Sequence, residues 1–194
     1  MKTVRRGEKM TEVDFESCIS MLQSGDMEGL RIIYVEYSKM IYSAVLNVTH
    51  SSHAAEDVTS EFFLKLKKAA SVYRKGSGHK KWLITAARNL AIDHIRKSRH
   101  EVSIEAGGGD DESHPLSEIP DNTDVESSVS AQMDAQSMLA VLNDAEREIV
   151  DLKIYCELTF AEISDVLHIP IGTAAWRYNA AVKKLKKHYG EVLL

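Results

Sequence analysis

Cationic and polar side chains recur along residues 80–99 at spacings suited to binding a polyanion. Steps of three and four residues place them on one face of a helix, where a rise of about 1.5 Å per residue extends the row over about 28 Å. The row comprises Lys81, Thr85, Arg88, Ile92, Arg96 and Arg99. Such a row can follow a phosphate backbone, and its binding should weaken steeply with salt. The residues therefore predict nucleic-acid binding, and the alternative is a solvated helix face.

The charge distribution favours a polyanionic partner. The chain of 194 residues is 44% hydrophobic and 27% charged, with a net formal charge of −5. Residues 101–136 contain ten acidic residues and no Lys or Arg, whereas residues 65–99 contain eleven Lys and Arg and a single acid, Asp93. Residues 177–188 add five Lys and Arg and no acid. Two basic blocks separated by an acidic spacer predict two contacts with a polyanion.

Four amphipathic helices are expected to position the first basic block, because apolar residues recur at helical spacing. Their expected ranges are 12–24, about 27–48, about 53–69 and about 80–99. Gly25 is a suitable cap for the first helix, Asp26 is a suitable start for the second, and a glycine loop at 76–78 precedes the fourth. We expect these helices to form one compact domain over residues 12–99.

A second, smaller helical domain is expected over residues 133–190. Asn143 with Glu146, and Thr159 with Glu162, each form the sequence pattern of a capping box at the start of a helix. A short helix, a turn of three or four residues and a longer basic helix then follow. This order is typical of a helix-turn-helix, although a plain helical hairpin has the same periodicity.

Residues 100–132 join the two domains and contain Gly, Ser and acidic residues but few large apolar ones. Such a segment cannot bury enough apolar surface to fold alone, so a flexible acidic linker is expected. The predicted fold is therefore all-α, with two small helical domains joined by this linker.

Other classes of protein are disfavoured by the composition. Cys18 and Cys156 stand alone, so neither a disulfide framework nor a zinc ribbon is expected. His50 and His53 could form a helical metal site with nearby acids, but surface positions are the favoured interpretation. No enzyme activity, cofactor or metal is predicted. The basic residues 1–10 precede no apolar stretch, and no apolar run reaches about 18 residues, so we expect no secretory signal, no membrane span and a cytoplasmic location.

Three motifs in the chain resemble those of the extracytoplasmic-function (ECF) sigma factors, the smallest sigma subunits of bacterial RNA polymerase. AAEDV at 54–58 with EFFLKL at 61–66 resembles their polymerase-binding helix. WL at 82–83 with ARNLAIDHIRK at 87–97 resembles their minus-ten promoter helix. LTF, EI, IP and GT between residues 158 and 173, followed by Arg177, resemble their minus-thirty-five helix-turn-helix. The order and spacing of the three motifs make the resemblance specific.

The resemblance implies a polymerase contact and a minus-ten contact. The polymerase-binding residues would be Glu56, Asp57, Glu61 and Lys65, facing the clamp helices of the largest subunit. The residues that bind and melt the minus-ten element would be Ser77, His79, Lys80, Lys81, Trp82, Thr85, Arg88, Asn89, Arg96, Lys97 and Arg99. In the family, the loop before this helix captures a flipped base. Ser77, His79 and Asn89 are the candidates for reading it, and Trp82 either stacks on a base or caps the core.

The second domain implies a minus-thirty-five contact, with departures from the family pattern. Its candidate residues are Thr159, Thr173, Ala175, Trp176, Arg177, Asn179, Lys183 and Lys184. His168 stands where the family usually has Gly, at a position expected to have a positive φ. A basic residue of the reading helix is replaced, so contact of Ala175 or Trp176 with thymine methyl groups is one hypothesis. Core packing of Trp176 is the favoured alternative.

The predicted function is that of an alternative sigma factor that binds core RNA polymerase, including its flap, recognises the minus-ten and minus-thirty-five elements, and promotes DNA melting. The resemblance also implies an anti-sigma partner and an acidic linker that lies in the RNA exit channel. The alternative is a helix-turn-helix regulator that acts without polymerase.

Overall fold

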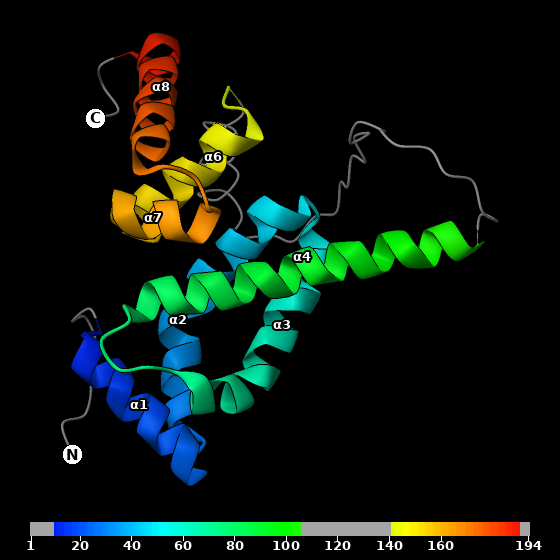
Figure 1. Cartoon of the computed structure of the whole chain (residues 1–194), viewed down its shortest axis with the longest axis vertical. Helices are drawn as coiled ribbons and strands as arrows, with labels where there is room; N and C mark the ends of the chain where they lie inside the picture. Colours follow the sequence, from blue (N-terminus) through cyan, green and yellow to red (C-terminus); the bar gives the residue numbers. More distant parts are fainter. Residues whose placement is uncertain (1–9, 106–140, 191–194) are drawn as a thin grey trace.

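The N-terminal part of the computed structural model is a helical bundle in which α2 lies at the centre (Figure 1). The structure describes residues 10–105 and 141–190, and side-chain surroundings from residue 10 to residue 100 and from 141 to 190. The elements of the bundle are α1 (Glu12–Ser24), α2 (Glu28–Thr49), α3 (Ser52–Ala69), the 3-10 turn η1 (Ala70–Val72) and α4 (His79–Glu105). Helices α1, α3 and α4 all pack against α2.

Within residues 141–190, the C-terminal part contains α6 (Asp144–Val150), η2 (Asp151–Tyr155), α7 (Phe160–Leu167) and α8 (Ile171–Tyr189). Helix α6 continues into η2 as one turn of π-helix. Every regular element in residues 10–105 and 141–190 is helical, which confirms the predicted all-α fold. None of the helices in these ranges is long and apolar enough to cross a membrane.

Local capping signals start the helices where the sequence predicts. The side chains of Asn143 and Thr159 each accept a hydrogen bond from the backbone N–H three residues later, and both capping boxes are complete. Gly25 closes α1 in the left-handed conformation, with φ of 92°. Asp26 is not the N-cap of α2, which is Met27, but its carboxylate accepts a hydrogen bond of 2.9 Å from the Glu28 backbone. Each such cap contributes about 1 kcal/mol.

The core of the bundle is formed by large apolar side chains from all four helices. Phe15, Ile33, Leu66 and Leu83 are fully buried. Burying each such side chain stabilises the fold by about 1.5–3 kcal/mol. Helices α1 and α2 pack tightly at Gly29, where an added Cβ would lie 2.4 Å from the Cys18 carbonyl oxygen. That contact admits only glycine.

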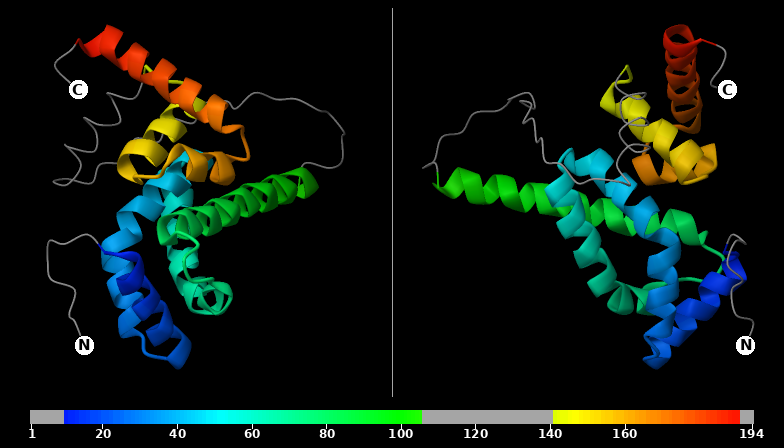
Figure 2. Two further views of the ribbon diagram at one scale, coloured as in Figure 1. Left: turned by 60° about the vertical axis from the view of Figure 1, so that its left-hand side comes forward. Right: turned by 180° about the vertical axis from the view of Figure 1, so that it is seen from behind.

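The two parts of the chain share one apolar core. Buried residues of the C-terminal part, including Leu152, Ile163 and Val166, belong to the same cluster as those of the bundle. Helix α7 lies on the N-terminal half of α4, as all the ribbon views show (Figures 1 and 2). The sequence predicts two domains joined only by a spacer, and this direct packing differs from that expectation. The predicted linker begins at residue 100, but α4 continues to Glu105, so residues 100–105 are helical. The rest of the predicted linker lies outside the described residues.

Candidate nucleic-acid interface

The minus-ten candidates at the start of α4 lie against an aromatic cluster. The rings of Tyr73 and Trp82 are 5.1 Å apart at the centroids, and Phe15 lies 6.2 Å from Trp82. Trp82 is half-buried and packs on the core, so the structure favours core capping among the two roles left open. Ser77 in the preceding loop is half-buried.

The position of His79 does not suit its expected role, which is to read a flipped base. It is buried, at 9% exposure, and its Nδ1 atom bonds the Glu12 carboxylate. Its ring stacks on Phe15 at 5.1 Å. A ring held in this way supports the fold around the loop and does not face a base in this arrangement.

The first half of α4 presents its cations to carboxylates of the C-terminal part. Arg88 bonds Glu148 at 2.8 Å, and another of its guanidinium nitrogens reaches the Val166 carbonyl oxygen at 3.5 Å. The Arg88 and Glu148 side chains are only 17% and 18% exposed. This pair is largely removed from water. Loss of either partner would therefore leave the other charge buried and unpaired, which costs more stability than the loss of a surface pair.

Two neighbouring cations are paired in the same way. Lys80 contacts Glu157 at 2.7 Å, and Lys81 contacts Asp165 at 3.2 Å. Thr85 donates its hydroxyl to the carbonyl of Lys81, one turn earlier in α4. These cations and Arg88 therefore face carboxylates in the described arrangement.

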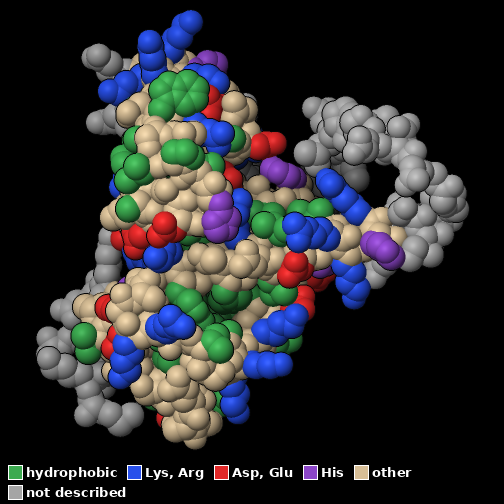
Figure 3. All heavy atoms as spheres, in the orientation of Figure 1, with side chains coloured by type: hydrophobic (Ala, Val, Ile, Leu, Met, Phe, Trp, Pro, Cys, Tyr) green, Lys and Arg blue, Asp and Glu red, His purple; other side chains and the backbone are tan. Residues whose placement is uncertain are grey.

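Exposed minus-ten candidates lie along α4 from Asn89 onward. Arg96 and Arg99 of the predicted row are exposed, as are Asn89 and Lys97. Arg96 has only a long contact, 4.0 Å, to Asp93. Figure 3 shows Lys and Arg side chains along this projecting part of α4 and at the far end of α8. This half of the row is accessible to a polyanion.

A buried carboxyl group lies where η2 packs on α2. The Ser43 hydroxyl donates to Asp151 at 2.6 Å. Burial, the strongest influence, raises the pKa of Asp151 to about 6, against the opposing hydrogen bonds from Ser43 and Cys156. Ionisation of Asp151 therefore disfavours this packing.

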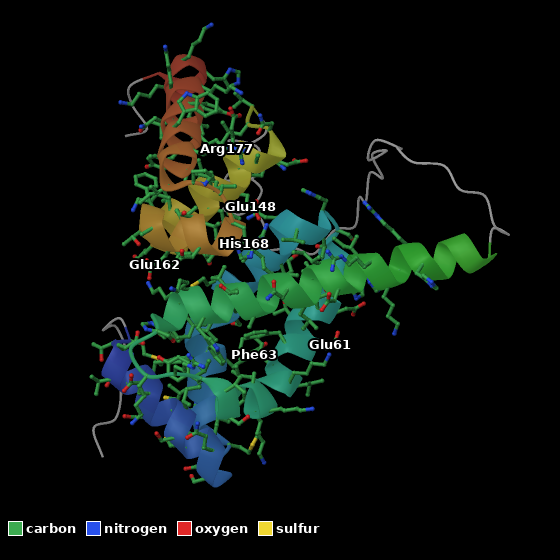
Figure 4. All side chains as sticks on the ribbon, viewed as in Figure 1. Glu61, Phe63, Glu148, Glu162, His168 and Arg177 are labelled. Atoms are coloured by element: carbon green, nitrogen blue, oxygen red, sulfur yellow. The ribbon has the colours of Figure 1, made fainter. Side chains whose placement is uncertain are left out.

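The helix-turn-helix is formed by α7 and α8. His168 ends α7 in the left-handed conformation, with φ of 53°, which confirms the predicted positive φ. The Ser164 hydroxyl donates to the Ile169 carbonyl at 2.6 Å and closes the turn. Figure 4 places His168 and Glu162 on the side of this module near α4, with Arg177 farther along α8.

The minus-thirty-five candidates differ in how accessible they are. Trp176 is 69% exposed, so its predicted core packing is wrong. The buried residues of α8 are Ala174 and Ala181, and Trp176, two positions after Ala174, lies on another side of the helix. Lys184 bonds Glu146 at 2.7 Å, and Thr159 serves as the N-cap of α7. The other candidates are Thr173, Ala175 and Arg177, which are half-buried, and Asn179 and Lys183, which are exposed.

The predicted polymerase contact lies on the outer face of α3. Glu56 and Asp57 are exposed, and Glu61 pairs with Lys65 (Figure 4 labels Glu61). His53 contacts Asp57 at 3.2 Å. Within residues 10–105 and 141–190, no three metal-ligating side chains cluster.

The carboxylates that face α4 were not found by sequence reasoning. Glu148 and Asp165 lie 60 and 84 positions after their partners in the chain. A periodic pattern within one helix carries no information about such distant pairs. The sequence gives one indication of these pairs, which is that α6 and α7 carry acidic residues although they precede a basic α8.

Comparison with known proteins gives matches over both parts. Residues 33–101 match the family described as Sigma-70 region 2, and residues 138–187 match Sigma-70, region 4. The chain is 26% identical to the ECF RNA polymerase sigma factor SigW of Bacillus subtilis, over 91% of this chain and 97% of that protein. It is 30% identical to the ECF RNA polymerase sigma factor BldN of Streptomyces coelicolor, over 77% of this chain and 56% of that protein.

A solved structure has a similar fold. The sigma factor RpoE in complex with the anti-sigma factor NepR from Bartonella quintana superimposes with a TM-score of 0.59, at 18% identity, over 84% of this chain and 97% of that one. At this identity the likeness concerns the fold alone.

Proposed function

The chain belongs to the extracytoplasmic-function sigma factors of the sigma-70 family and is an alternative sigma factor, and from that premise we propose which surfaces contact the polymerase and the promoter. One observation carries the proposal. The two matched sigma segments each contain one basic helix, α4 in the first part and α8, preceded by α7 in the helix-turn-helix, in the second. The segment that matches region 2 precedes the segment that matches region 4, and recognition of a promoter by one chain requires this order.

Helix α4 and the loop before it bind the minus-ten element. The exposed cations Arg96 and Arg99 make the first contacts with phosphates, because they are accessible in the described arrangement. Arg88, Lys80 and Lys81 extend the contact along the same helix. Each phosphate contact adds about 0.9 to the salt slope on duplex DNA and about 0.7 on a single strand.

Contact of Arg88, Lys80 and Lys81 with phosphates requires both α6 and α7 to leave α4, because Glu148 lies on α6 and Asp165 on α7. A guanidinium that donates to Glu148 and to the Val166 carbonyl cannot offer the same protons to a phosphate. The described arrangement is therefore a closed form, in which carboxylates occupy the minus-ten cations. An open form exchanges Glu148, Glu157 and Asp165 for phosphates at Arg88, Lys80 and Lys81.

The helix-turn-helix binds the minus-thirty-five element through α8. Trp176 and Asn179 are exposed on this helix, and Lys183 follows one turn later. Contact of the Trp176 ring with thymine methyl groups replaces the missing basic residue. We assign Lys184 a lesser part, because Glu146 already neutralises it.

The acidic outer face of α3, with Glu56, Asp57 and Glu61, docks on a basic surface of core polymerase. Promoter DNA and core polymerase are thus the main partners. We also propose an anti-sigma partner, since the similar RpoE structure is a complex with an anti-sigma factor. The role is non-catalytic, and the site of action is the cytoplasm, where polymerase and promoters are found.

Transcription with purified components tests this function. The chain is mixed with core polymerase and a promoter library, and start sites are mapped. Start-site selection that needs both proteins is the expected result. If the chain instead shifts duplex DNA alone and adds no start site, it is a helix-turn-helix regulator and the proposal is wrong.

A paired substitution tests the role of α4. Replacing Arg88 and Arg96 together by Ala should abolish permanganate reactivity of thymines in the minus-ten region, because both phosphate contacts are lost. Replacing Lys67 and Lys68, which lie exposed at the end of α3, removes the same charge and should leave reactivity intact. Reactivity that persists in the Arg88, Arg96 variant would refute the assignment.

A further inference from the structure

Helix α1 bonds the segment that leads into α4 through three polar side chains. Gln23 donates to the Ala70 carbonyl at 2.9 Å, and Glu16 accepts from the Gly76 backbone N–H at 3.0 Å. Glu12 accepts from the Tyr73 hydroxyl at 2.6 Å. These α1 residues lie outside the segment 33–101 that matches Sigma-70 region 2. The matched region therefore receives its loop restraint from a helix that precedes it.

One carboxylate bonds both ends of the loop 74–78. Besides Tyr73 before the loop, Glu12 accepts from the backbone N–H of His79 at 3.0 Å, immediately after the loop, and also bonds the His79 ring. Burial of Glu12 raises its pKa, but the hydrogen bonds from Tyr73 and His79 together lower the pKa to about 2. The group is thus an anion that three donors hold in place.

The loop itself contains residues that give the backbone freedom. Gly76 and Gly78 both have left-handed φ values, 73° and 79°. Glycine has more conformations to lose than any other residue, so a loop with two glycines needs external restraint to hold one shape. Glu12 restrains the two ends of the loop, and Glu16 restrains its middle at Gly76.

We propose that Glu12, with Glu16, is a positioning residue that sets the shape of the minus-ten loop and thereby the sequence preference at the minus-ten element. The inference rests on the proposed role of that loop in promoter recognition. His79 then acts as an anchor that transmits the restraint into α4, and Ser77 belongs to the loop that is restrained in this way. A side chain that reads a base must be held in place by supporting residues, and α1 supplies these residues.

The variants Glu12→Gln and Tyr73→Phe test the proposal in the full chain with core polymerase. Glu12→Gln keeps the size of the side chain and removes its charge, whereas Tyr73→Phe keeps the ring and removes one donor. Glu28→Gln is the matched control, because Glu28 is a carboxylate of the same domain that pairs at the surface with Arg31. Start sites are mapped on a library randomised in both promoter elements.

The expected result is a loss of discrimination confined to the minus-ten element. Glu12→Gln should reduce the preference among minus-ten sequences by about tenfold, as expected for loss of hydrogen bonds to a charged group, and Tyr73→Phe by less. Preferences at the minus-thirty-five element should stay as in the wild type and in Glu28→Gln. Amide hydrogen exchange should rise at Gly76 and His79 in the Glu12→Gln variant.

Three outcomes would overturn the proposal. Faster exchange in the loop with unchanged minus-ten preference means that the restraint has no part in recognition. Equal loss of preference at both elements means that α1 only stabilises the domain. If Glu12→Gln does not fold, Tyr73→Phe serves as the test instead, and an unchanged minus-ten preference in Tyr73→Phe refutes the proposal. Failure of the wild-type chain to select start sites would instead refute the proposed function.

Discussion

Charge reversal at Glu148 should open the closed form. Glu148→Lys places an ammonium group against Arg88, whose present partner is largely buried. Removing one partner of a buried pair costs about 3 kcal/mol, whereas more exposed pairs such as Lys80 with Glu157 contribute about 0.5 kcal/mol. The buried pair therefore dominates, and its loss should shift the ratio of closed to open molecules by about 100-fold.

Pulsed electron spin measurements of distance can detect that shift in the free protein. Spin labels are attached at Ser98→Cys on α4 and Lys187→Cys on α8, both exposed positions, while Cys18 and Cys156 are buried and should resist labelling. The wild type should give one short, narrow distribution. Glu148→Lys should give a broad distribution at longer distance.

Two variants separate the ion pair from general charge effects. Glu36→Lys makes the same change of charge at an exposed position of α2 and should keep the narrow distribution. Exchange of both partners, Arg88→Glu with Glu148→Arg, should restore it. If Glu148→Lys keeps the wild-type distribution while it remains folded, the pair does not hold the two parts together and the reasoning is wrong.

Further predictions concern single carboxyl groups and the accessible cations. The pKa of Asp151 is raised from 3.8 to about 6, so ionisation of Asp151 should lower the free energy of unfolding by up to about 3 kcal/mol as pH rises through that window. Urea unfolding measured at several pH values should show this loss in the wild type and not in Asp151→Asn. Glu12 has a lowered pKa, so the roughly 2 kcal/mol it contributes above about pH 4.5 should disappear as pH falls toward 2, and Glu12→Gln should unfold without that dependence. Replacing Arg96 and Arg99 by Ala should reduce the salt slope of holoenzyme binding to duplex promoter DNA by about 1.8, measured by fluorescence anisotropy, and an unchanged slope would exclude both from phosphate contact. Asp57→Lys should weaken capture of core polymerase in a pull-down while circular dichroism shows intact helices, and undiminished capture would count against the α3 contact.

Local features of the fold could be predicted because their causes lie within a few residues. The capping boxes at Asn143 and Thr159 need only two side chains three positions apart, and both formed. The left-handed conformation of His168 follows from the turn that the next helix requires. The fold class follows from helical periodicity in the same way.

Features set by distant parts of the chain could not be predicted. The pairing of Arg88 with Glu148 joins residues 60 positions apart, and helical spacing placed Arg88 only on a face, not against a partner. Core packing is the favoured prediction for Trp176, but α8 turns Ala174 and Ala181 toward the core and leaves Trp176 exposed. The sequence predicts that His79 reads a base. Its burial depends on the bond to Glu12, which lies on a separate helix.

The exchange of carboxylates for phosphates at Arg88 is tested most directly by the same spin-label distance in the holoenzyme, first alone and then on promoter DNA. The labels on α4 and α8 should move apart when the promoter complex opens, because the Arg88 protons that bond Glu148 and the Val166 carbonyl must leave them to bond the minus-ten backbone. A promoter complex that melts DNA and still shows the short, narrow distribution of the free protein would contradict this account.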